Sequence, residues 1–182
     1  MTAMRYAAFL RNVNLGRPNS PTRAQFEAAF LASGAATAVS FLVNGTLVFT
    51  LAPGQRPRAV AARACAAMRA SCGMREPVFV RSVAELQALV AGDPFAGVVA
   101  DGRDACCISL LGAPRQPLPA LPFVSARGDL ELLRADDTHV LSVSRWVGKS
   151  AGSPNAWLER ALGEPATTRN WRTVLRLVEK YA

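Results

Sequence analysis

The segment Thr167-Thr168-Arg169-Asn170-Trp171 places two hydroxyls, a guanidinium and an amide at the start of a helix-forming stretch that runs to residue 182. The free N–H groups of a helix N-terminus and the positive end of its dipole favour a phosphate or a carboxylate. We therefore expect Thr168 to be the N-cap of the C-terminal helix. Thr168, Arg169 and Asn170 are candidate ligand-binding residues. The alternative is a cap without a ligand, in which Asn170 bonds to a neighbouring loop.

A second polar group follows the first expected strand, residues 5–13. Arg11, Asn12 and Asn14 stand where that strand leaves the sheet, and loops at strand ends often carry function. Arg11 could instead pair with an acid, and the two asparagines could simply shape the turn. All three are retained as candidate ligand-binding residues.

Lys149 lies in the glycine-rich segment Gly148-Lys149-Ser150-Ala151-Gly152, which resembles part of a phosphate-binding loop. The full motif requires a glycine five residues before Gly148, and Val143 stands there instead. A nucleotide-hydrolase loop is therefore not expected. A flexible loop could still bring Lys149 towards the helix start at Thr168.

Other site chemistries find little support in the sequence. With one histidine and no C-x-x-C pair, no metal site is expected. A serine–histidine pair would have to use His139 and Ser142, which point to opposite faces of a regular strand. No dinucleotide fingerprint is present, and no cofactor is expected. The cysteines, expected to be mostly buried free thiols, are Cys65, Cys72, Cys106 and Cys107.

The formal charge is +8, from 21 basic and 13 acidic residues. The first hundred residues hold ten arginines and four acids, a balance of +6, and the remainder has a balance of +2. Such a charge favours polyanions or anionic metabolites as partners. A skewed coding composition is the alternative, because 19 of the 21 basic residues are arginine and alanine is frequent.

Just over half of the residues are apolar, which is enough for a packed core. No apolar run approaches the roughly 18–20 residues that cross a bilayer. The first ten residues carry Arg5 inside an apolar run and lack a small-residue cleavage site, so they predict a strand and not a signal peptide. We expect a cytoplasmic protein with no membrane partner.

The elements that position the first polar group follow the order β-α-β-β-α-β. Strands are expected over 5–13, 39–43, 46–51 and 77–81, and helices over 22–33 and about 57–71. Asn44-Gly45 predicts a two-residue hairpin turn, and Gly34 and Gly73 are expected to end the two helices. This order is that of a ferredoxin-like half, in which two helices cover one face of a four-stranded antiparallel sheet.

The second half is expected to echo the first loosely. Its strands are expected over 105–111, 129–134 and 139–145, its loop over 114–122, and its helices over 155–162 and from 167. Asn155 is expected to cap the first of these helices. The predicted fold class is α+β, with two ferredoxin-like halves, antiparallel sheets and a C-terminal helix. Domains are expected over 1–82 and 104–182, joined by a connecting helix (83–91) and linker over 83–103.

Three segments carry a family resemblance: 9–16 (FLRNVNLG), 40–49 (SFLVNGTLVF) and 168–174 (TRNWRTV). They are similar to the opening LRGINVGG, the hairpin YIQSGNVVF and the closing TRNWNTV of the bacterial domain of unknown function 1697 family. Their order and spacing agree with that family over nearly the whole chain. The resemblance implies an α+β architecture of two ferredoxin-like subdomains, and the family has no established function.

The chain departs from the family pattern in two places. Asn12 stands where the family has a glycine after the arginine, which disfavours a close backbone approach at residue 12. The tip Val43-Asn44-Gly45-Thr46 replaces the family's Ser-Gly-Asn. Asn44 is a candidate ligand-binding residue, and a contact that the family makes through its serine would be lost or altered here.

The sequence therefore predicts a protein that binds an anionic ligand, either nucleic acid or a phosphorylated metabolite, in a basic cleft between the two halves. The candidate residues are Arg11, Asn12, Asn14, Asn44, Lys149, Thr168, Arg169 and Asn170. Two alternatives stay open. One is a small-molecule enzyme that uses the same cleft, with Lys149 and the arginines as electrophilic stabilisers. The other is a protein-interaction module that uses an open sheet face or edge.

Overall fold

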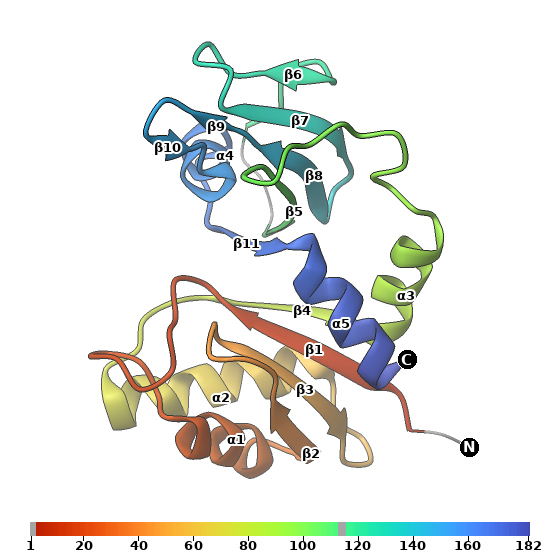
Figure 1. The fold of residues 1–182 in the computed structure, drawn as a ribbon. Helices are drawn as coiled ribbons and strands as arrows, with labels where there is room; N and C mark the ends of the chain where they lie inside the picture. Colours follow the sequence, from red (N-terminus) through yellow and green to blue (C-terminus); the bar gives the residue numbers. More distant parts are fainter. Residues whose placement is uncertain (1–2, 113–115) are drawn as a thin grey trace. The chain divides into compact units, whose positions relative to one another are not determined.

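The computed structural model describes residues 3–112 and 116–182 and has an α+β fold with antiparallel sheets (Figure 1). The chain divides into two compact units. Unit 1 comprises Met1–Ala88 and Lys180–Ala182, and unit 2 comprises Leu89–Glu179. Each unit has its own sheet and its own hydrophobic core.

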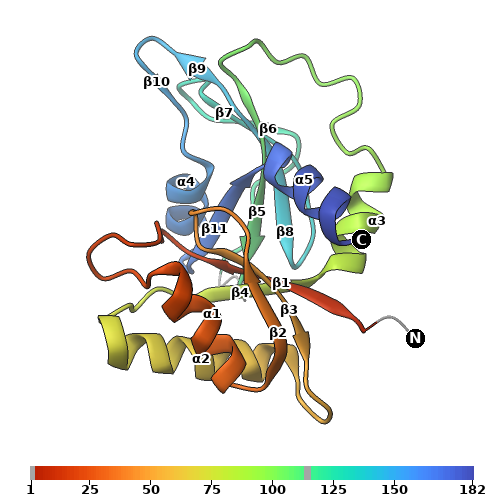
Figure 2. The same ribbon diagram turned by 60° about the horizontal axis from the view of Figure 1, so that its bottom comes forward.

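Unit 1 follows the order β-α-β-β-α-β that the sequence predicts. Its elements are β1 (Arg5–Leu10), α1 (Arg23–Ala32), β2 (Ala35–Ser40), β3 (Thr46–Leu51), α2 (Pro57–Cys72) and β4 (Val78–Ser82). The strands pair in the order β2-β3-β1-β4, every pair antiparallel. Helices α1 and α2 lie together on one face of this sheet (Figures 1 and 2). Helix α3 (Val83–Ala91), which crosses the unit boundary, has its expected bounds.

Local signals account for the helix ends in unit 1. Thr22 and Gln25 form a capping box, in which the Gln25 N–H donates to Thr22 Oγ1 at 3.2 Å and the Thr22 N–H donates to Gln25 Oε1 at 2.8 Å. Pro57 opens α2 at a position where its missing N–H is harmless. Gly73 ends α2 with φ 74°, a conformation that glycine adopts without strain.

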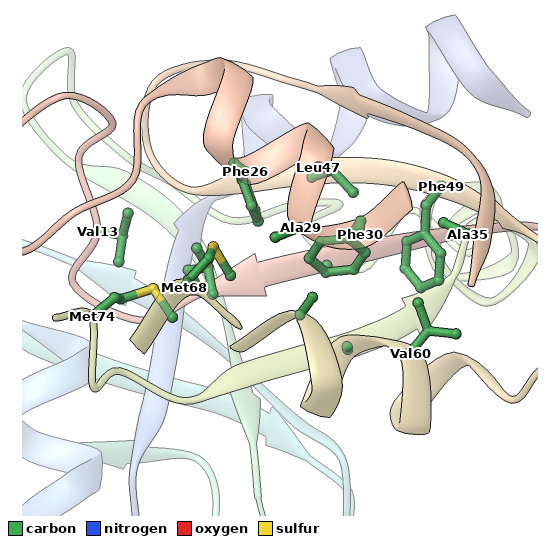
Figure 3. Close-up of a cluster of buried hydrophobic side chains, with 14 residues drawn as sticks. Val13, Phe26, Ala29, Phe30, Ala35, Leu47, Phe49, Val60, Met68 and Met74 are labelled. Atoms are coloured by element: carbon green, nitrogen blue, oxygen red, sulfur yellow. The ribbon is translucent and has the colours of Figure 1, made fainter. Parts of the chain in front are cut away.

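The core of unit 1 lies between the sheet and its two helices (Figure 3). Phe30 is fully buried, with its ring centroid 5.6 Å from that of Phe26 and 5.1 Å from that of Phe49. Helix α2 contributes the face expected from its spacing, including Val60 and Met68. Burial of such side chains contributes roughly 1.5–3 kcal/mol each, so this cluster fixes how the helices lie on the sheet.

The hairpin between β2 and β3 is longer than expected. The sequence predicts a two-residue turn at Asn44-Gly45, but the connection runs from Phe41 to Gly45, and the Phe41 N–H donates to the Thr46 carbonyl at 2.7 Å. Phe41 is buried, and its ring meets that of Tyr181 edge-on at 6.0 Å. Packing of this aromatic ring therefore overrides the local turn preference.

Unit 2 is built around a five-stranded antiparallel sheet in the order β11-β5-β8-β7-β6. Its elements are β5 (Ala105–Leu111), β6 (Phe123–Val124), β7 (Leu130–Ala135), β8 (His139–Ser144), β9 (Trp146–Val147), β10 (Ser150–Ala151), α4 (Pro154–Leu162), β11 (Ala166–Asn170) and most of α5 (Trp171–Tyr181). The last two residues of α5 belong to unit 1. Leu158 and Leu162 of α4 pack on one face of this sheet. The expected loop over 114–122 falls partly on residues 114 and 115, which lie outside the described residues.

The described part of the second half does not follow the β-α-β-β-α-β order, so the expectation of two ferredoxin-like halves is not confirmed. One helix, α4, stands between β10 and β11, and β9 and β10 form a separate two-stranded ribbon. The sequence offers a strong helix signal only at residues 155–162 in this region, and β5 pairs with the distant β11 instead of continuing into a helix. Pairing between strands that are distant in the sequence leaves no signal in the local pattern of residues.

Two helix starts in unit 2 differ from expectation. Ser153, not Asn155, caps α4, because its side chain accepts from the Ala156 N–H at 3.3 Å. Thr168 is not a helix cap. It lies within β11, opposite Ser109 of β5, and α5 begins at Trp171. Asn170 takes the capping role, because its Oδ1 accepts the Arg172 N–H at 2.9 Å.

Candidate functional site

The eight candidate residues fall into two groups of four. Unit 1 holds Arg11, Asn12, Asn14 and Asn44, and unit 2 holds Lys149, Thr168, Arg169 and Asn170. Within unit 1, the structure brings its four candidates to one end of the sheet. A shared cleft for the two groups stays a prediction.

The unit 1 candidates lie on two adjacent loops, residues 11–16 and 41–45, which we call the loop pair. The Leu10 N–H donates to the Gly45 carbonyl at 2.8 Å, and the Leu15 N–H donates to the Val43 carbonyl at 2.8 Å. A Cβ at Gly45 would lie 3.0 Å from the Cβ atoms of Leu10 and Val13. The loops therefore meet closely, and the φ of +68° at Gly45 together with this tight contact favours glycine at position 45.

Two of the four non-glycine residues with positive φ in the described chain lie in the loop pair. Asn12 has φ 49° and Leu42 has φ 65°, in the left-handed region. Asparagine tolerates this conformation better than other residues with a Cβ, which explains why it can replace the family's glycine at position 12. Leucine does not, and the conformation at Leu42 costs roughly 1–2 kcal/mol. Strain of this kind clusters at ligand and switch sites.

Some polar side chains of the loop pair form ion pairs or hydrogen bonds within the protein, and others are exposed to solvent. Arg11 Nη1 lies 2.6 Å from Glu76 Oε2, so its charge is compensated, as the alternative interpretation of the sequence anticipated. Asn44 Oδ1 accepts the Thr46 hydroxyl at 2.9 Å and fixes its own loop. Asn12 and Asn14 are exposed. Asn12 and Asn14 are therefore accessible to a ligand.

The unit 2 candidates of β11 point to both faces of the sheet. Thr168 Oγ1 lies 2.7 Å from Ser109 Oγ, on the face that α4 covers. Arg169, on the opposite face, is 7% exposed and donates to Thr167 Oγ1 at 2.8 Å and to the Thr168 carbonyl at 2.9 Å. Burial lowers the pKa of the Arg169 guanidinium to about 10. Its geometry is that of a structural arginine within unit 2.

Lys149 sits at the tip of a small ribbon that the sequence did not predict. Ser150 pairs with Val147 and Ala151 with Trp146, so Gly148 and Lys149 form a two-residue turn, with φ 63° at Gly148. This ribbon is not followed by a helix at Ser150, which agrees with the rejection of a phosphate-binding loop.

Trp146, missed by the sequence analysis, is exposed on the same ribbon, and the Arg103 guanidinium carbon lies 5.8 Å from the centroid of its ring. Trp146 could have been recognised in the sequence as an aromatic residue between two basic residues. It follows Arg145 and stands three residues before Lys149.

A carboxylate network anchors this ribbon to the rest of unit 2. Arg145 donates to Asp104 Oδ2 at 3.0 Å and to Glu131 Oε2 at 2.6 Å. The Trp146 N–H donates to Asp104 Oδ1 at 2.9 Å. This backbone hydrogen bond, with the one from Arg145, lowers the pKa of the Asp104 carboxyl below its ordinary value. Asp104 is therefore a carboxylate at neutral pH and holds both residues.

The net charge differs more between the two units than between the first hundred residues and the rest of the chain. Unit 1 holds eleven basic and three acidic residues, a balance of +8, whereas unit 2, with its three undescribed residues included, holds ten of each and is neutral. The basic residues are thus almost equally shared, and the acids are not. No acid occurs between Glu27 and Glu76. The charge difference between the units cannot be calculated from the sequence until the boundary between them is known.

Helix α2 and its flanks carry exposed arginines within this acid-free stretch. Arg56, Arg58 and Arg69 are exposed, and within the described chain no carboxylate forms an ion pair with any of them. Arg58 and Arg69 are eleven residues apart, so they share a face of the helix at a spacing of roughly 16 Å. Arg63 is different, because it donates to the Ser33 carbonyl at 2.7 Å and to Gln55 Oε1.

Thiol and metal chemistry gain no support. All four cysteines are free, Cys107 is buried and the others are half-buried. Burial raises the pKa of the Cys65 and Cys107 thiols to about 11, which leaves few thiolates at neutral pH. Over residues 3–112 and 116–182, no group of three or more His, Cys, Asp or Glu side chains could hold a metal ion. None of the helices described there has the length and apolar composition of a membrane span.

These features define an α+β protein with a basic first unit and a neutral second unit. The chain belongs to the family described as protein of unknown function (DUF1697), whose model matches residues 4–140. Two of the three segments that carry the resemblance lie within this match, and residues 168–174 lie beyond it.

Among solved structures, the chain is similar to the conserved bacterial protein SP0830 from Streptococcus pneumoniae, with a TM-score of 0.62 and 12% sequence identity over 98% of each chain. At this identity the likeness shows the fold alone. No curated protein matches the chain.

Proposed function

We propose that the protein binds nucleic acid through exposed arginines of unit 1, with α2 as the principal contact. The single observation that carries the proposal is the division of charge, +8 in unit 1 against zero in unit 2. Charged surfaces of this kind attract the phosphate backbone and speed its association.

A skewed coding composition does not account for this division. Such a bias raises arginine along the whole chain, and both units have a similar number of basic residues. The difference lies in the acids, three in unit 1 and ten in unit 2. Because unit 1 has few acids, its positive charge is not neutralised within the unit. A surface that binds a polyanion needs this property.

The arrangement of the arginines favours an extended polyanion over a single phosphorylated metabolite. A small ligand needs convergent groups in a concave site. Arg58 and Arg69 instead stand exposed along one side of α2, roughly 16 Å apart by helix geometry. A phosphate chain can meet both, and the exposed amides of Asn12 and Asn14 add hydrogen-bonding groups within the same unit.

The test measures binding of a fluorescein-labelled 20-nucleotide single strand and a 20-base-pair duplex by anisotropy, at 50 and 200 mM salt. The variant Arg58→Gln/Arg69→Gln removes two charges from α2. The matched control is Arg160→Gln/Arg172→Gln, which removes two charges from exposed positions of unit 2 and leaves the same net charge. Each lost phosphate contact lowers the slope of log affinity against log salt by about 0.7–0.9.

We expect the α2 variant to lose affinity roughly tenfold or more, with a salt slope lower by about 1.4–1.8, and the control to change little. Equal losses in both variants would mean that only overall charge matters and would overturn the proposed surface. Absence of binding at 50 mM salt, with saturable binding of a phosphorylated metabolite instead, would replace nucleic acid by a small ligand.

A further inference from the structure

Trp146 is an exposed indole held in a fixed orientation. It is 39% exposed, whereas Trp171 is 8% exposed and the ring of Trp157 packs against that of Phe123, with centroids 5.0 Å apart and planes tilted by 40°. Its Nε1–H donates to the Gly148 carbonyl at 3.0 Å, and its backbone N–H donates to Asp104 at 2.9 Å. The polar atom of the ring is therefore satisfied, and what the side chain offers to a partner is its aromatic surface.

The ribbon that carries Trp146 is braced at several points. Arg127 donates to the Val147 carbonyl at 3.0 Å and to Ser150 Oγ at 2.8 Å, and Arg145 is held by Asp104 and Glu131. Gly152 lies against the backbone of Asp129. A surface that is already ordered loses little conformational entropy when it binds, which is the benefit of preorganisation.

Two cations, one against the indole and one at the tip of the same ribbon, have no carboxylate partner among the described residues. Arg127 forms an ion pair with Asp129. Arg145 forms ion pairs with Asp104 and Glu131, so the charges of both arginines are neutralised within unit 2. Arg103 lies against the Trp146 ring, and Lys149 stands exposed at the ribbon tip. Within the described residues, neither forms an ion pair with a carboxylate side chain. The result is a rigid aromatic surface with two available positive charges.

We infer that Trp146, with Arg103 and Lys149, forms a stacking site for a base of single-stranded nucleic acid. The inference rests on the proposed function and adds the class of nucleic acid. Unit 2 is neutral, so it offers no general attraction for phosphate, but stacking of a base on an indole or a guanidinium does not need net charge. Bases within a duplex are already stacked on one another, so a single strand fits this site and a duplex does not.

The experiment compares a 12-nucleotide oligothymidylate with a 12-base-pair duplex, using the full chain. Trp146→Ala removes the ring, and Trp146→Phe retains an aromatic surface. We expect Trp146→Ala to weaken oligothymidylate binding roughly five- to 150-fold, as truncation of a stacking side chain does. Trp146→Phe is expected to recover part of that loss, and duplex binding is expected to stay within twofold of wild type.

Tryptophan fluorescence of the unaltered protein gives a second readout that does not depend on how Trp146→Ala folds. Oligothymidylate is expected to quench the emission of wild type, and the quenching is expected to disappear in Trp146→Phe, which keeps the two less exposed tryptophans. Arg103→Gln is expected to weaken the oligothymidylate complex severalfold and to leave the duplex complex unchanged.

The outcomes separate this inference from the proposed function. If the α2 variant weakens both probes and Trp146→Ala weakens neither, the stacking site is wrong and the arginine surface stands. If Trp146→Ala weakens oligothymidylate binding and the α2 variant has no effect, the arginine surface is wrong and the stacking site stands. Equal losses of single strand and duplex in Trp146→Ala, or unquenched emission of wild type at saturation, would also overturn the stacking site.

Discussion

Gly152 gives the sharpest test of the packing in unit 2, and the perturbation is a single methyl group. A Cβ at this position would lie 2.0 Å from the Asp129 carbonyl oxygen and 2.7 Å from its carbon. The same carbonyl accepts the Arg145 N–H at 2.8 Å, so it is fixed in place. Because the obstacle is backbone and not a flexible side chain, Gly152→Ala must displace the chain itself.

The magnitude follows from the displacement. Ordinary van der Waals contact begins at 3.4 Å, so the two segments must separate by roughly 1.4 Å, a strain that typically costs about 1–3 kcal/mol in a packed region. Two hydrogen bonds would stretch, from the Gly152 N–H to the Arg145 carbonyl at 3.1 Å and from Ser144 Oγ to the Gly152 carbonyl at 2.6 Å. At about 0.5–1.5 kcal/mol for each bond, the total destabilisation is about 2–6 kcal/mol.

Urea unfolding followed by circular dichroism measures this loss as a shift of the midpoint. Gly102→Ala is the matched control, because the chemical change is identical and a Cβ there has nothing within 4 Å. The control is expected to change stability by less than about 1 kcal/mol in either direction. A loss below 1 kcal/mol in Gly152→Ala, or equal losses in the two variants, would refute the close approach of residues 129 and 152.

Three further variants test other parts of the structure. Phe30→Ala is expected to destabilise the protein by about 3–5 kcal/mol in urea unfolding, because its ring is fully buried between two others. Arg169→Ala is expected to lower the melting temperature and leave oligonucleotide affinity unchanged, because its guanidinium is buried. The stability advantage of wild type over Asp104→Asn is expected to be present at pH 7 and to shrink below about pH 4, because the lowered pKa of this carboxyl favours folding only while it is ionised.

Each of these expectations has a contrary result. A loss below 1 kcal/mol in Phe30→Ala would mean that the three rings do not pack as described. A weaker oligonucleotide complex in stably folded Arg169→Ala would assign that guanidinium to ligand binding, as the sequence first suggested. A stability difference for Asp104→Asn that does not decrease at any pH below 4 at which the wild type stays folded would contradict the contribution of the ionised carboxylate.

The sequence predicts the elements whose signals are local. Strands β3 and β5 and helix α3 have their expected bounds, because alternation, apolar runs and flanking glycines act within a few residues. Thr22 opens α1 for the same reason. The class of the fold and the antiparallel sheet of unit 1 follow from the order of these elements.

The errors lie where distant partners decide the outcome. Thr168 has the side chain of a helix cap, but hydrogen bonding of β11 to β5 draws it into a strand. Asn155 is a good cap by type, and Ser153 takes the role because Pro154 fits the first helical position. The short ribbon that carries Lys149 has only two paired residues on each side, too few to leave a pattern in the sequence.

The candidate site was predictable only in part. Arg11, Asn12, Asn14 and Asn44 were chosen from their positions after strands, and the structure gathers them on the loop pair. The sequence does not indicate Trp146, because an isolated aromatic residue is expected in the hydrophobic core unless its exposure is known. The shortage of acids in unit 1 could be recognised only after the chain had been divided into units.

The makeup of the positive charge on unit 1 has a consequence for control of the protein. Arginine is the basic side chain that holds its proton most strongly, and ten of the eleven cations of this unit are arginines. The unit has no histidine, the side chain whose ordinary charge change falls between pH 5 and pH 8, and no aspartate. Under the proposed function, histidine protonation is therefore no switch for this unit, and release of a bound polyanion would depend on ionic competition, exchange with another polymer or cleavage.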